Sequence, residues 1–184
     1  MSVELEGDRV VESNVAAVAI GASAGAVEAL SAILPALPEE FPFSIFIVVH
    51  VPPDRVSYLV ELFRRKCRAT IREAEDKDTI LAGTIYFAPP DYHLLIERAK
   101  TISLSSEEAV NFSRPSVDVL FESAADAYGP ELLGIVLTGG SDDGAQGLRD
   151  RRRGRARVGT MSRRRTIPPD APGGIRTLPR REVV

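Results

Sequence analysis

The chain has 184 residues, which is enough for one ordinary domain and too few for two comfortable ones. Apolar residues make up 44% of it, so the chain can bury a core, and this composition excludes a disordered protein. The net charge of −3 conceals two unlike segments: residues 1–150 hold 12 basic and 24 acidic residues, whereas residues 151–184 hold 11 arginines and two acidic residues.

The sequence gives no sign of export or of membrane insertion. The acidic first residues do not resemble a signal peptide, and the densest apolar run, residues 45–49, is far too short to span a bilayer. Cys67 is the single cysteine, which excludes an internal disulfide, and we expect it to be a partly buried free thiol. We therefore expect a cytoplasmic protein.

Strand and helix signals alternate along the chain. Short apolar runs bounded by glycine or proline predict strands at residues 15–20, 44–49, 69–73, 84–87 and 132–138. Apolar stripes at helical spacing predict helices at residues 26–37, 58–66 and 117–128. Residues 93–97 and 101–104 are predicted to pair as a hairpin, and Ser116 and Gly129 are predicted to cap the last helix. The strongest strands are apolar at every position, which indicates an open α/β domain with a mostly parallel sheet.

Three polar side chains follow the three most convincing strands: Ser23, His50 and one of the pair Asp142 and Asp143. The carboxyl ends of parallel strands meet at one edge of a sheet, where α/β proteins bind their ligands. A hydroxyl, an imidazole and a carboxylate brought together there could perform nucleophilic acyl transfer.

Each of these residues also has an ordinary structural interpretation. Ser23 could cap the following helix, His50 could be a structural histidine, and the aspartates could be turn residues. The spacing Gly21-x-Ser23-x-Gly25 fits a nucleophile elbow and not the dinucleotide fingerprint, which disfavours a nucleotide-binding module. The other histidine, His93, is predicted to lie at the amino edge of the sheet in a structural role.

Five blocks of the sequence together resemble the catalytic domain of the chemotaxis protein-glutamate methylesterases. They are "AIGASAG", "VVHVPP", "YFAPPDYHLL", "SRPSVDVLFESAA" and "GIVLTGGSDDGAQGL". The resemblance covers residues 15 to about 150. It implies a doubly wound, three-layer α/β domain of the Rossmann-like kind. The implied reaction is hydrolysis of glutamate γ-methyl esters on the cytoplasmic helices of methylated chemoreceptors, with release of methanol; many members also deamidate receptor glutamines.

Carried over residue by residue, the resemblance makes Ser23 the nucleophile, His50 the general base and Asp143, rather than Asp142, the group that orients the base. It assigns the oxyanion to backbone N–H groups at Gly139, Gly140 and Ser141, although the family has Met and Gly where this chain has the last two. It implies no metal, no cofactor and no nucleic-acid partner. The alternative is a catalytically impaired family remnant that only docks to receptors.

Residues 151–184 depart from the family pattern, in which a helix, a strand and a Met-Pro segment follow. They contain no apolar run longer than two residues, and are either a basic arm, a disordered tail or an out-of-frame translation, which we favour. We expect an extension at 1–14, a catalytic domain at 15–150 truncated at its C-terminal end, and this tail. The family's receiver domain is not expected in this chain, because only about 14 residues precede the first strand.

Overall fold

The structure is a computed structural model, and it describes residues 14–23, 25–50, 56–137 and 157–161. Within these residues, six parallel strands form one sheet in the order β3-β4-β2-β1-β7-β8. Their bounds are β1 Ala17–Ala22, β2 Ser44–Val49, β3 Thr70–Glu73, β4 Thr84–Phe87, β7 Leu132–Leu137 and β8 Arg157–Met161. An antiparallel hairpin of β5 (His93–Ile96) and β6 (Ile102–Ser105) lies apart from this sheet.

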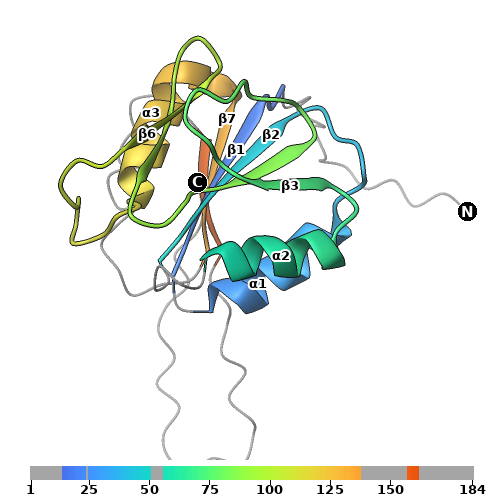
Figure 1. Ribbon diagram of the computed structural model, residues 1–184. Coiled ribbons are helices and arrows are strands. Elements are labelled where there is room, and N and C mark those ends of the chain that lie inside the picture. Colours follow the sequence, from blue (N-terminus) through green and yellow to red (C-terminus); the bar gives the residue numbers. More distant parts are fainter. Residues whose placement is uncertain (1–13, 24, 51–55, 138–156, 162–184) are drawn as a thin grey trace, which may run out of the picture.

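Helices and the hairpin cover the two faces of the sheet. Figure 1 shows α1 (Ala26–Ile33) and α2 (Val56–Lys66) together on one side, and α3 (Val117–Tyr128) with the hairpin on the other. Short 3₁₀ turns at Leu34–Ala36 and Gly129–Glu131 follow α1 and α3. The predicted three-layer, doubly wound α/β domain with a mainly parallel sheet is confirmed.

Strand β2 shows why the sequence of the sheet is apolar at every position. Ile45, Ile47 and Val49 point into the core beneath α1 and α2, whereas Phe46 and Val48 point into the core beneath α3. Both sets are buried, because successive side chains of a strand face opposite sides of the sheet.

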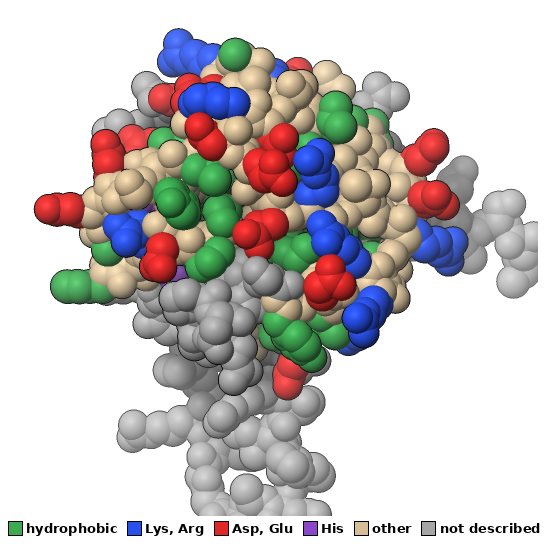
Figure 2. Space-filling view, viewed as in Figure 1, with side chains coloured by type: hydrophobic (Ala, Val, Ile, Leu, Met, Phe, Trp, Pro, Cys, Tyr) green, Lys and Arg blue, Asp and Glu red, His purple; other side chains and the backbone are tan. Residues whose placement is uncertain are grey.

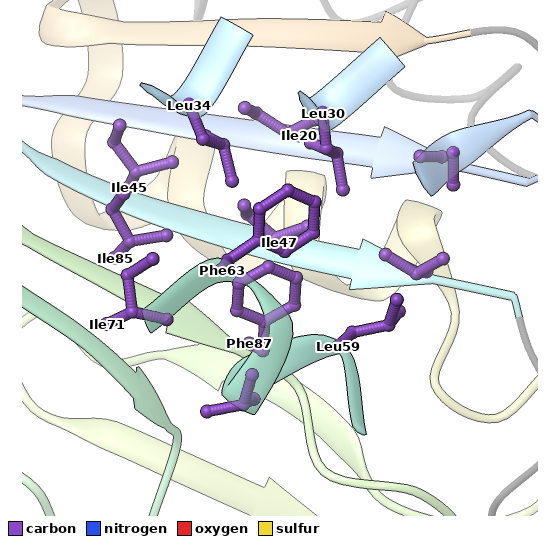
Figure 3. Close-up of a cluster of buried hydrophobic side chains, with 14 of the residues drawn as sticks. Ile20, Leu30, Leu34, Ile45, Ile47, Leu59, Phe63, Ile71, Ile85 and Phe87 are labelled. Atoms are coloured by element: carbon purple, nitrogen blue, oxygen red, sulfur yellow. The ribbon is translucent and has the colours of Figure 1, made fainter. Parts of the chain in front are cut away.

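The core beneath α1 and α2 consists of large side chains (Figure 3). Phe63 of α2 stacks on Phe87 of β4 with ring centroids 5.9 Å apart and an interplanar angle of 13°. Leu30 and Leu34 close the same core from α1 and the turn after it, and both are fully buried. Burial of each such side chain stabilises the fold by about 2 kcal/mol.

The core beneath α3 combines aromatic residues with small ones, for example Ala17 and Ala19 on β1 and Ala124 on α3. Lys100, in the turn of the hairpin, ties the hairpin to the end of α3. Its Nζ donates to the Ala127 carbonyl oxygen over 2.7 Å and lies 3.3 Å from the centre of the Tyr128 ring. Desolvation by burial lowers the pKa of this lysine.

Most predicted elements are confirmed, with shifts at their ends. β2 and β4 have the predicted bounds, whereas β1 begins and ends two residues later than predicted. The first helix ends at Ile33 and continues as a 3₁₀ turn, because Pro35 has no N–H to continue the α-helical hydrogen bonding. Ser116 is the N-cap of α3, although its side chain makes no capping hydrogen bond to the helix.

Strand β8 shows that five residues of the arginine-rich segment form regular structure, whereas the out-of-frame origin of the segment stays a prediction. Residues 157–161 lie where we expected a disordered or out-of-frame tail, yet they pair in parallel with β7 from Leu133↔Arg157 to Leu137↔Met161. An edge strand is held through backbone bonds to one neighbour, so it does not need the long apolar run on which the expectation depended. Residues 151–156 and 162–184 lie outside the described residues, and the domain boundaries stay predictions.

Two further results concern the described part of the chain only. It contains no helix long and apolar enough to cross a bilayer. It also contains no group of three or more His, Cys, Asp and Glu side chains that could hold a metal ion.

Candidate active site

Ser23 and His50 occupy neighbouring positions at the carboxyl edge of the sheet. The last residues of β1 and β2, Ala22 and Val49, are register partners, and the His50 backbone N–H donates to the Ala22 carbonyl oxygen over 3.0 Å. Adjacent strands lie about 4.8 Å apart, so the two residues that follow these partners begin from adjacent points of the backbone. The structure therefore brings the predicted nucleophile and base to one place.

The turn after β1 separates Ser23 from the helix cap. The Ser23 carbonyl oxygen accepts a hydrogen bond from the Ala26 N–H over 2.9 Å, which closes the turn. Gly25, not Ser23, is the N-cap of α1, and its φ of 82° lies in the left-handed region that favours glycine. The interpretation of Ser23 as a helix cap is therefore wrong. Its side chain is half-buried at the edge of the sheet.

Gly21 has a different reason to be glycine. A Cβ atom at this position would lie 2.3 Å from Val117 Cγ1 and 2.8 Å from Val117 Cγ2. The first turn of α3 thus packs directly on the end of β1, two residues before Ser23. The two glycines of the Gly-x-Ser-x-Gly pattern allow, respectively, this close packing and the left-handed turn into α1.

His50 follows β2 directly and is half-buried. Its Nε2 atom is shielded from solvent. A shielded imidazole nitrogen at this edge suits a base that must exchange a proton with a neighbouring hydroxyl, because low polarity strengthens the hydrogen bond between them.

His93 is in a structural environment. It is 2% exposed, its Nδ1 accepts a hydrogen bond from the Ser116 N–H over 3.2 Å, and its Nε2 lies 3.0 Å from the Glu108 carbonyl oxygen. Nδ1 accepts, so Nε2 carries the proton and donates, and the ring is neutral. The predicted structural role is supported.

The predicted position of His93 is wrong. This residue lies on the separate β5–β6 hairpin, beside the first turn of α3, and not at the amino edge of the main sheet. The reason is that residues 93–105 pair with one another and pack on α3 instead of joining the parallel strands.

The third strand of the predicted site also ends at this edge. Leu137, the last residue of β7, is the register partner of Ala22, so β7 ends level with the residue before Ser23. Asp142, Asp143 and the predicted oxyanion residues Gly139, Gly140 and Ser141 lie outside the described residues.

Two contacts of α3 were not predicted from the sequence: Val117 packs against Gly21, and the Ser116 N–H donates to His93. Both contacts join segments far apart in the chain. The glycine at position 21, which has no side chain, was the only sequence signal for the contact with Val117.

Comparisons with known proteins give consistent results. A family model described as CheB methylesterase matches residues 18–166, a range that includes β8. A protein of Leptospira interrogans named "Putative protein-glutamate methylesterase/protein-glutamine glutaminase" is 48% identical over 136 residues, 74% of this chain and 70% of that protein. A Yersinia pestis protein-glutamate methylesterase/protein-glutamine glutaminase is 42% identical over 134 residues, 71% of this chain and 38% of that one.

A solved structure agrees with these relatives. The crystal structure of the Thermotoga maritima CheB methylesterase catalytic domain superimposes with a TM-score of 0.74 at 32% identity and covers 78% of each chain. The resemblance that the sequence blocks indicated is confirmed, and this chain belongs to the CheB methylesterase family.

Proposed function

We propose that this chain is a serine hydrolase that removes methyl groups from glutamate γ-methyl esters of chemoreceptors and releases methanol. The observation that carries the proposal is the register of β1 and β2, which sets Ser23 beside His50 at the edge where parallel sheets bind ligands. Relatives are named as glutaminases too, so deamidation of receptor glutamines at the same site is part of the proposal.

In the proposed mechanism, His50 takes the proton of the Ser23 hydroxyl while the oxygen attacks the ester carbonyl carbon. Asp143 orients the imidazole and stabilises its protonated form. Backbone N–H groups at Gly139, Gly140 and Ser141 hold the oxyanion of the tetrahedral intermediate. His50 then returns the proton to the departing methoxide, and methanol leaves.

The second half of the reaction regenerates the serine. Water attacks the acyl-serine while His50 again acts as the base, and the products are a free glutamate side chain and free Ser23. A glutamine substrate would follow the same steps with ammonia as the leaving group. We propose that the partner is a cytoplasmic helix of a methylated receptor, which places the reaction in the cytoplasm.

Methanol release from methylated receptor membranes tests the proposal. Ser23→Ala and His50→Ala should each lower the rate by at least about a thousandfold, because the two residues act as a unit. Ser31→Ala, which removes another serine hydroxyl on α1, is the matched control and should keep the wild-type rate. Wild-type turnover in the Ser23 variant would contradict the proposal.

Two further measurements separate the alternatives. A fluorophosphonate probe should label the wild-type protein at Ser23, whereas a non-catalytic remnant would stay unlabelled. Asp143→Asn should slow methanol release more than Asp142→Asn does; the reverse order would move the orienting role to the neighbouring residue.

A further inference from the structure

Exposed large hydrophobic side chains occur in several segments next to the catalytic edge of the molecule. Among the described residues, six such side chains are exposed: Val27, Tyr58, Leu81, Tyr92, Val110 and Phe112. Val27 and Tyr58 lie in the first turns of α1 and α2, which follow β1 and β2. Tyr92 follows β4, and Val110 and Phe112 lie in the loop before α3. Leu81 precedes β4 and so lies toward the amino edge of the main sheet.

Phe112 occupies a backbone conformation that does not suit it. The N–H groups of Val110 and Ser113 each donate to the other residue's carbonyl oxygen, over 3.2 and 3.0 Å, and close a tight turn. The two central residues have positive φ, 50° for Asn111 and 60° for Phe112. Turns with positive φ at both central positions favour Asn followed by Gly, and a bulky residue there is strained.

The turn is held in place from both sides. Asn111 Nδ2 donates to the Asp118 carboxylate over 2.8 Å, and Arg114 Nη1 donates to the carbonyl oxygens of Ser106 and Glu107 over 2.9 and 3.0 Å. Phe112 is nevertheless fully exposed, at 104%. The fold therefore accepts both backbone strain and an apolar side chain in water at a fixed position, which indicates a function outside the fold.

The turn is connected to the proposed active site through Val117. Val117 lies five positions after Phe112, and such a segment spans at most about 18 Å. Val117 occupies the space beside Gly21, two residues before Ser23. In Figure 1 the segment between β6 and α3 forms the loop at the left of the molecule, continuous with the start of α3.

We propose that Val27, Tyr58, Tyr92 and Phe112, which we call the apolar rim, bind the helix of the protein substrate that carries the esterified glutamate. This inference rests on the proposed function. The ester must reach Ser23 at this edge, so the polypeptide on either side of it must lie over the residues that surround the edge. An amphipathic helix offers apolar side chains three and four residues from the ester, and aromatic side chains are the common anchors for such a face.

Figure 2 shows acidic and basic side chains interspersed over the face of the molecule that it presents. The substrate side chain itself is a neutral ester. Recognition by apolar contact therefore fits the chemistry of the esterified substrate.

The test compares a protein substrate with a small ester. Methanol release is measured on methylated receptor membranes and on N-acetylglutamate γ-methyl ester with wild-type protein, Phe112→Ser, Phe112→Gly and Leu81→Ser. Loss of one aromatic anchor should lower the ratio of kcat/KM for the receptor to kcat/KM for the small ester about tenfold, mainly through KM. Leu81→Ser, which removes an equally apolar exposed side chain away from the rim, should keep the wild-type ratio.

Phe112→Gly also separates binding from stability. Glycine relieves the positive φ, so this variant should melt about 2–4 °C above the wild type while it loses receptor specificity. A merely structural role for Phe112 would lower the melting temperature and leave the ratio unchanged.

Three outcomes would overturn the inference, and they can be told apart. An unchanged ratio in both folded Phe112 variants would remove the rim but leave the proposed function intact. A wild-type dimer that Phe112→Ser converts to a monomer in sedimentation would assign the rim to a second copy of the chain. Wild-type protein inactive on both substrates would overturn the proposed function, and the inference with it.

Discussion

The face of the sheet beneath α1 and α2 is filled by large aliphatic and aromatic side chains, whereas the face beneath α3 depends more on small residues and buried hydrogen bonds. Phe63 and Phe87 stack in the first core, and Ala19 and Ala124 lie in the second. On the second face, His93 holds the start of α3. The first face therefore mainly stabilises the fold, whereas the second face positions the edge that carries Ser23.

Phe63→Ala should give the largest effect, because it removes a ring from the middle of the first core. Phe63 is fully buried, and such a truncation costs about 3–5 kcal/mol of unfolding free energy. Urea unfolding followed by circular dichroism measures this. Methanol release well below the melting temperature should stay near the wild-type rate, since the residue packs on the face of the sheet opposite α3. Phe63→Leu, the control, should cost less than half as much; a similar fall in rate for both variants would break the division between the faces.

Gly21→Ala, on the second face, should affect the rate of methanol release more and the stability less than Phe63→Ala does. The added Cβ must displace Val117 or β1, and such overpacking costs about 1–3 kcal/mol of stability. The displacement occurs two residues before Ser23, so kcat for methanol release should fall about tenfold or more, since a misplacement of about 1 Å is costly in catalysis.

The double variant Gly21→Ala/Val117→Ala is the control for this steric explanation. It removes both Cγ atoms that the new Cβ would meet and should recover part of kcat. If it recovers nothing, the contact with α3 is not what keeps position 21 as glycine.

Asp76→Asn should produce the smallest effect, confined to the hairpin side and dependent on pH. The Asp76 carboxylate accepts a hydrogen bond from the Leu104 N–H over 3.0 Å, and this bond lowers the pKa of Asp76. A lowered folded pKa means that the carboxylate stabilises the protein above the unfolded pKa of about 3.9 and that this contribution is lost as the pH falls through the folded value. The variant should melt slightly below the wild type at pH 7, and this difference should shrink as the pH falls below the unfolded pKa of about 3.9. A difference that does not change with pH would contradict the role of ionisation.

Local patterns predicted the sheet and α3 well, because a strand buried on both faces must be apolar throughout and glycine or proline marks its ends. β2 and α3 have their predicted bounds for this reason. The pairing of Ser23 with His50 followed from the rule that parallel strands end at one edge. The catalytic roles of Ser23, His50 and Asp143 stay predictions.

What the sequence could not reveal depends on contacts between distant segments. β8 is a strand because β7 offers it a free edge, not because residues 157–161 form an apolar run. His93 lies against Ser116, 23 residues away, since the hairpin packs on α3. Phe112 has a positive φ, which bulky residues disfavour, so no propensity argument would predict its conformation.

The register of β1, β2 and β7 also determines where insertions and deletions can occur in the chain. Ala22 is level with both Val49 and Leu137, so the three strands end at the same height. Deleting one residue from β2 would draw His50 back by about 3.3 Å and turn alternate side chains to the opposite face. Insertions and deletions are therefore restricted to the connections between strands, and homologous sequences should align without gaps across these three strands.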